Sequence, residues 1–160
     1  MTADERRARL MEAIERFGQA VESLPDESFL HEVDGRSPRD VVAHLIGWNR
    51  YTIAGEGELQ RGELPSYLVD PGDDFSRVNA LSMQKYASRD KGELLGELRA
   101  STRELDQFLR ALPPAEWDDN HGVTWRGRPV TTGWLVRALV HDYNEHRREI
   151  ESWPRQADGA

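Results

Sequence analysis

Residues 138–150 read ALVHDYNEHRREI, and the apolar side chains of this stretch decide the fold. Leu139, Tyr143 and Ile150 are separated by four and seven residues. This spacing places their side chains on one face of an α-helix. The pattern extends in both directions, so we predict an amphipathic helix over residues 131–153, with a threonine cap at its start and a proline just beyond its end.

Other parts of the chain repeat the helical period of apolar side chains. Four long amphipathic segments with little strand content predict an all-α protein built as a four-helix bundle. Apart from the last helix, the predicted helical segments cover residues 2–23, 37–55 and 75–112, the third being interrupted near residues 88–90.

The connections between these segments contain most of the glycine and proline signals. Short extended connectors are predicted before the helices that begin near residues 37 and 131, with two extended pieces around Gly127. The loop over residues 60–74 is long for a compact domain and suggests a lid or a variable insertion. We predict one domain over residues 1–154 and a disordered tail over residues 155–160.

The composition of the chain excludes several classes of site. Lys and Arg number 21 against 29 for Asp and Glu, which gives a net charge of −8, and there is no cysteine. Any metal must therefore be held by His, Asp or Glu. The acidic charge argues against nucleic-acid binding, and no apolar run reaches the length of a membrane span. We expect a cytoplasmic bacterial protein with no nucleic-acid or membrane partner.

The five histidines differ in their expected surroundings. His31 and His121 lie in turn-rich stretches, where surface or turn roles are expected. On a helical wheel of the last helix, His146 falls inside the apolar arc and His141 falls on the opposite face. Asp142 lies near the edge of the arc, one turn before His146, so the two side chains are neighbours.

A buried aspartate needs a partner, which could be a cation, a histidine or an arginine. His44 lies on the flank of the apolar face of the helix predicted from residue 37. We predict a metal site formed by His44, Asp142 and His146, with Glu149 as a carboxylate behind it. The alternative from the same residues is a buried polar cluster that joins the two helices.

The sequence resembles the DinB-like superfamily at these positions. The resemblance rests on VDGRSPRDVVAHLIGW at residues 33–48 and ALVHDYNEHRREI at residues 138–150, and the likeness spans nearly the whole chain. It implies a four-helix bundle, frequently a homodimer. It also implies a metal site of three histidines, whose first and third positions match His44 and His146. Asp142 stands at the middle position, and two histidines with one carboxylate still suit Zn, Ni, Fe or Mn.

The resemblance also implies a range of activities. Some members resemble thiol S-transferases that use bacillithiol or mycothiol, others resemble metal-dependent isomerases, and a metal-poor branch resembles colibactin self-protection proteins. Our first hypothesis is a metal-dependent thiol transferase or hydrolase that acts on a small electrophilic molecule. Mycothiol or another low-molecular-weight thiol would be the cosubstrate, since the chain has no thiol of its own.

Within this hypothesis His44 and Tyr51 are the predicted catalytic residues, with Tyr51 as a proton donor. Two alternatives use the same bundle. One is a metal-free hydrolase or sequestering protein for a reactive small molecule, with the loop over residues 60–74 covering the ligand. The other is a non-catalytic dimeric interaction module, which predicts an axial pocket filled by apolar side chains.

Overall fold

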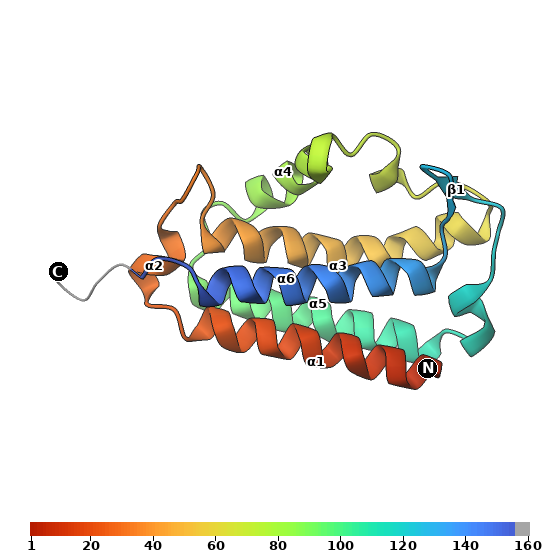
Figure 1. Cartoon of the computed structure of the whole chain (residues 1–160), viewed down its shortest axis with the longest axis horizontal. Coiled ribbons are helices and arrows are strands. Elements are labelled where there is room, and N and C mark those ends of the chain that lie inside the picture. Colours follow the sequence, from red (N-terminus) through yellow and green to blue (C-terminus); the bar gives the residue numbers. More distant parts are fainter. Residues whose placement is uncertain (156–160) are drawn as a thin grey trace.

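Four long helices lie side by side in the computed structural model, which describes residues 1–155 (Figure 1). They are α1 (Ala3–Glu22), α3 (Pro38–Gln60), α5 (Lys91–Ala111) and α6 (Thr132–Glu151). Helices α1 and α6 run in one direction, opposite to α3 and α5 (Figure 1). The predicted all-α four-helix bundle is confirmed. Of the predicted tail, residues 156–160 lie outside the described residues.

The remaining elements are short and belong to the connections. Helix α2 (Asp26–Leu30) follows α1, and α4 (Ser76–Lys85) packs on the outside of α3 as the chain returns to the start of α5. The 3-10 helices are η1 (Ser66–Leu68), η2 (Asp73–Phe75) and η3 (Pro114–Asp118). Strands β1 (Thr124–Trp125) and β2 (Arg128–Pro129) pair antiparallel, as the extended pieces around Gly127 predict.

Each long helix packs mainly against two of the other three. Contacts join α1 to α6, α6 to α3, α3 to α5 and α5 to α1, so the helices enclose one axis. Their starts are fixed by side-chain caps: Ser37 accepts from the backbone N–H of Asp40, and Thr131 accepts from that of Trp134. These caps set where α3 and α6 begin, and thereby which side chains the two helices present to each other.

Helix α3 is longer than the sequence predicts. The glycines at residues 55 and 57 suggest an end near residue 55, but the helix continues to Gln60. Gly55 has a packing role instead, because a Cβ atom there would lie 2.8 Å from the hydroxyl oxygen of Tyr67. Glu56 is consequently inside the helix and only 4% exposed, rather than in a frayed end.

A buried polar network crosses the middle of the bundle. The Tyr143 hydroxyl on α6 donates to Asn49 Oδ1 on α3 at 2.7 Å, and Asn49 Nδ2 donates to the Ser101 hydroxyl on α5 at 3.0 Å. All three side chains are fully buried. The network ties α6 and α5 to the same point on α3.

We expect Tyr143→Phe to lower the free energy of unfolding by about 1–3 kcal/mol, because Asn49 Oδ1 would then be buried without a donor. Urea denaturation measures the change. The matched control is Tyr51→Phe. Tyr51 is half-buried and its hydroxyl has no hydrogen bond among residues 1–155, so this variant should change stability by less than about 0.5 kcal/mol. Equal effects of the two variants would contradict the assigned network.

No helix in the described part of the chain combines the length and apolar character that crossing a membrane requires.

Candidate functional site

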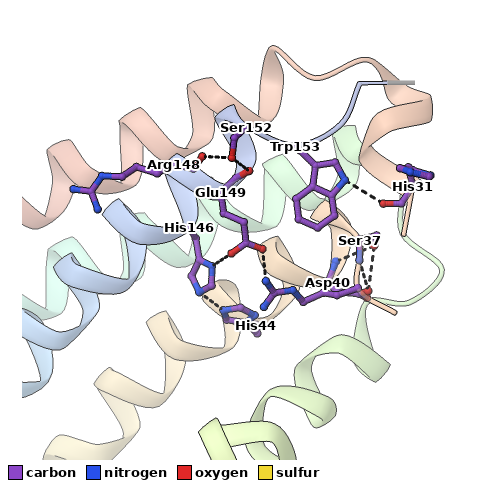
Figure 2. A network of polar contacts seen from close by, with 10 residues as sticks. His31, Ser37, Asp40, His44, His146, Arg148, Glu149, Ser152 and Trp153 are labelled. Carbon is purple, nitrogen blue, oxygen red and sulfur yellow. Dashed lines mark hydrogen bonds and ion pairs between the residues drawn. The ribbon is translucent and has the colours of Figure 1, made fainter. Parts of the chain in front are cut away.

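Two histidines that are 102 residues apart in the sequence meet between α3 and α6. His44 Nε2 and His146 Nε2 lie 3.1 Å apart, and their ring planes are inclined by 69° (Figure 2). His44 is 5% exposed, and the side chain of His146 is 15% exposed. The resemblance implies that His44 and His146 meet, whereas the position of His44 on the flank of its helix left that open. A direct contact of the two rings agrees both with the predicted metal site and with the alternative of a buried polar cluster. His141 is 74% exposed and pairs with Glu145 on the outer face, as the wheel predicts.

Glu149 orients the second histidine from behind. Its Oε2 lies 3.1 Å from His146 Nδ1, on the side of the ring away from His44 (Figure 2). Its other oxygen accepts from the guanidinium of Arg36, which lies in the turn before α3. Polar contacts therefore run without a break from Arg36 through Glu149 and His146 to His44.

The protonation of this chain follows from its contacts. A carboxylate can only accept, so the Nδ1–H of His146 donates to Glu149, and in a neutral His146 the Nε2 atom carries a lone pair. Burial, followed by the charges of His146 and Arg36, lowers the pKa of His44 to about 3. Burial opposes ionisation of Glu149, but His146 and Arg36 outweigh it and lower its pKa. His44 is therefore neutral, and Glu149 is a carboxylate.

The histidine pair opens onto a cavity of about 620 Å³. This volume lies within the range of about 300–1,000 Å³ that is usual for small-molecule sites. Aromatic rings form much of the wall, and part of it comes from the connection after α3, for which the sequence suggests a lid or a variable insertion. The aromatic lining residues are Trp48, Phe75, Trp125 and Trp134, and Leu68 and Asp74 belong to the connection.

The other two predicted site residues are placed differently. Asp142 lines the same cavity and is half-buried, but its carboxylate does not close a three-ligand group with the two histidines within 4.8 Å. It has no hydrogen bond or ion pair within residues 1–155, and burial raises its pKa. Tyr51 packs among aromatic rings, stacked on Tyr67 and edge-on to Trp48, and does not line the cavity.

A second group of titratable side chains lies at the other end of α3. Glu56, Glu116 and His121 bring one potential ligand atom each to within 4.8 Å of one another, the only such trio in the described chain. The expectation of a surface or turn role for His121 is incomplete, because its Nε2 contacts Glu116 Oε1 at 2.5 Å and its side chain is only 21% exposed. The sequence gives no sign of this group, since its members come from three elements.

Known proteins were compared with the chain on sequence and on structure. Residues 9–150 match the family model of the DinB superfamily. No curated protein matches by sequence. Among solved structures, the chain is similar to DfsB, described as a sibling lethal factor precursor, with a TM-score of 0.79, 15% identity, and coverage of 96% of this chain and 95% of that one.

Two further structures show the range of proteins that share this fold. The colibactin self-resistance protein ClbS, in complex with dsDNA, has a TM-score of 0.78 and 14% identity, covering 98% of this chain and 97% of that one. The mycothiol-dependent maleylpyruvate isomerase has a TM-score of 0.75 and 13% identity. There the match covers 96% of this chain but only 65% of the isomerase.

These comparisons correct one expectation and establish the family. The exclusion of nucleic acid was wrong as an inference from net charge, because ClbS has the same fold and is seen bound to dsDNA. Net charge sums the whole surface and does not describe local patches. DinB-like proteins thus include a mycothiol-dependent isomerase and a self-resistance protein. With the family model matched over residues 9–150, the chain belongs to the DinB superfamily.

Proposed function

We propose that this protein is a divalent-metal-dependent enzyme that transfers a low-molecular-weight thiol to a small electrophilic molecule or hydrolyses that molecule. The observation that carries the proposal is the contact of His44 Nε2 with His146 Nε2 at 3.1 Å on the wall of the cavity.

The separation of the two nitrogens fits a shared cation. Two imidazole nitrogens, each about 2.0–2.1 Å from one ion in tetrahedral or square geometry, lie roughly 2.9–3.4 Å apart. The other ring nitrogen of His146 faces Glu149, and metal-ligating histidines usually donate that second N–H to a carboxylate. His44 is neutral, as a ligand must be.

Asp142 remains the predicted third ligand. It is the carboxylate on α6 that lines the cavity one turn before His146 and has no partner of its own within the described residues. When bound, a divalent metal lowers the pKa of a coordinated thiol or water and so supplies a nucleophile at neutral pH. The thiol must come from a second molecule, because the chain has no cysteine.

The cavity wall supports a role in binding the electrophile. Trp48, Phe75 and Trp125 provide flat apolar surfaces, and Trp48 is fixed by a 2.8 Å hydrogen bond from its Nε1 to Asn79 Oδ1. Such a wall holds an apolar molecule and excludes water from the reacting atoms. An open cavity counts against the interaction-module hypothesis, which predicts a filled one.

A metal-free enzyme is the second candidate, and a specific observation favours it. The contacts from His44 through His146 to Glu149 also form a proton relay in which the His44 Nε2–H donates to His146 Nε2, while Arg36 holds Glu149 as a carboxylate. In this arrangement His44 would act as the base by passing its Nε2 proton to His146, and Glu149 would stabilise the protonated His146. Its activity would survive removal of metal.

The test uses the full-length chain, purified without a histidine tag and treated with EDTA. An aryl chloride, an epoxide and an ester are each incubated with mycothiol or with water alone, before and after Zn²⁺ or Mn²⁺ is restored. We expect turnover that requires metal, is lost in His146→Ala and is retained in the exposed-histidine control His141→Ala. Turnover that survives EDTA would support the metal-free enzyme, and no turnover by metal-loaded protein would contradict both.

We expect Glu149→Gln to weaken metal binding at the histidine pair by about 10–100-fold, the usual effect of removing a carboxylate behind a histidine ligand. The amide loses the charge that faces His146 and Arg36. The control is Glu151→Gln on the same helix, which removes only an ion pair with Arg147. Calorimetric titration with Zn²⁺ measures both, and equal affinities for the two variants would contradict the role of Glu149.

A further inference from the structure

The end of the bundle away from the histidine pair contains a second set of metal-binding side chains. Glu56 comes from α3, Glu116 from η3 and His121 from the connection before β1. Glu56 lies twelve residues after His44 on the same helix, so the two sites are separated by about 18 Å along its axis. A single ion cannot serve both sites.

Glu56 is the buried centre of this set. It is 4% exposed, one of its oxygens accepts from Gln60 Nε2 at 3.1 Å, and the other accepts from the hydroxyl of Thr132 at the start of α6. Acidic side chains are almost never fully buried without a cationic partner. No Lys or Arg within residues 1–155 forms an ion pair with Glu56 or Glu116. The hydrogen bonds orient Glu56, but they do not neutralise its charge.

The two carboxyl groups also contact each other. Burial raises the pKa of Glu56, and a hydrogen bond with Glu116 raises it further. The hydrogen bond from His121 is the main cause of the lowered pKa of Glu116. Two adjacent carboxylates cannot both stay ionised in a buried place unless a proton or a cation lies between them. The ligand atoms of the two carboxyl groups and of His121 lie within 4.8 Å of one another, close enough for one cation to reach all three.

A separate observation indicates a missing polar partner beside Glu56. Tyr67 is 7% exposed, and its buried hydroxyl has no hydrogen-bond partner in the described chain. This hydroxyl lies against Gly55, the residue before Glu56. Burial raises the pKa of Tyr67, and the charges of Glu58 and then of Glu56 raise it further. A buried hydroxyl without a partner requires an explanation, and water on an ion held by Glu56 would be one.

We propose that Glu56, Glu116 and His121 bind one first-row divalent cation, of the Zn²⁺ or Mn²⁺ class, at a site distinct from the histidine pair. One imidazole with two carboxylates is a ligand set that suits these ions. Binding releases to solvent the proton shared by the carboxyl groups, and also the proton of His121 where that residue is charged. Gln60 and Thr132 hold Glu56 in place from behind.

The consequence of this site is structural support for the cavity. The ion would join α3 to the connection over residues 112–131, and Thr132 extends the link to the start of α6. The same connection carries Trp125, which lines the cavity, and α6 begins with Trp134 on the same wall. A cation here fixes these walls without taking part in the reaction.

The experiment isolates the second site by removing the first. The full-length, untagged double variant His44→Ala/His146→Ala is stripped with EDTA and titrated with Zn²⁺ and with Mn²⁺ in a calorimeter. We expect one equivalent of bound ion and a raised melting temperature. Adding His121→Ala, or separately Glu116→Gln, should weaken binding at least tenfold. The matched control adds His141→Ala and Glu145→Gln, which removes an exposed Glu–His pair and should leave the affinity unchanged.

The outcomes separate this proposal from the proposed function. If the double variant binds no ion although its circular dichroism shows a folded helical protein, the second site is wrong. If it binds an ion whose affinity survives both Glu116→Gln and His121→Ala, the assigned ligands are wrong. If wild type and double variant each bind one ion, the histidine-pair site fails while the second site stands.

Discussion

Replacing His146 by alanine is expected to weaken binding of Zn²⁺ or Mn²⁺ at the cavity by at least about 100-fold, because loss of a direct ligand costs more than loss of the residue behind it. His44, which is 5% exposed, would be the one imidazole left at the site. It would lose the His146 Nε2 atom that lies 3.1 Å from its own Nε2, and alanine offers no ligand atom in its place. Thiol transfer should fall with the metal. The protein should keep its fold, since His146 lies at the edge of the cavity and its side chain is 15% exposed.

The matched control for this prediction is His141→Ala. His141 lies on the same helix, is 74% exposed and pairs only with Glu145, so removing it deletes one histidine without touching the cavity. Metal content after dialysis, measured by mass spectrometry, should fall by one equivalent in His146→Ala and not in His141→Ala. Unchanged metal content in His146→Ala would show that the histidine pair is a hydrogen bond between helices and not a metal site.

Replacing Phe17 by alanine is expected to lower the free energy of unfolding by about 3–5 kcal/mol, the usual cost of removing a fully buried aromatic ring. Phe17 on α1 is 0% exposed and meets Tyr143 on α6 edge-on, with ring centroids 5.5 Å apart. Its removal leaves a void where α1 supports the helix that carries His146. The loss is large against a total stability of about 5–15 kcal/mol.

Urea denaturation followed by circular dichroism measures the effect of Phe17→Ala. Leu81→Ala is the control, because Leu81 is a large apolar side chain that is 61% exposed, and its loss should change stability by less than about 0.5 kcal/mol. A loss below about 1 kcal/mol in Phe17→Ala would contradict the packing of α1 against α6.

The sequence predicts those features that depend on a regular helical period. The wheel of the last helix assigns His146 to the inner face and His141 to the outer face, and the structure confirms both. The threonine cap predicted for the last helix is an equally local signal, and the structure shows it at Thr131. The helical period predicts only the direction in which a side chain leaves the helix axis. It therefore places Asp142 at the edge of the apolar face but does not predict the distance from its carboxylate to the two histidines.

Features that depend on tertiary contacts escape the sequence. Gly55 suggests the end of a helix, but in the structure its missing side chain lets Tyr67 approach α3. Because the sequence predicts that the helix ends there, it does not predict the burial of Glu56. The contact of Arg36 with Glu149 joins a turn to a helix more than a hundred residues away. Glu116 and His121 lie in a connection without periodicity, so nothing local brings them to Glu56.

The most direct test of the central claim is anomalous diffraction from crystals of the untagged, full-length protein grown with Zn²⁺. The histidine-pair site predicts an anomalous peak between α3 and α6, at about 2.0–2.1 Å from both His44 Nε2 and His146 Nε2. The second site predicts a separate peak at Glu56, which also reports that the ion was available. A filled second site with no peak between the histidines, and with their Nε2 atoms still in direct contact, would contradict the claim that His44 and His146 hold a metal.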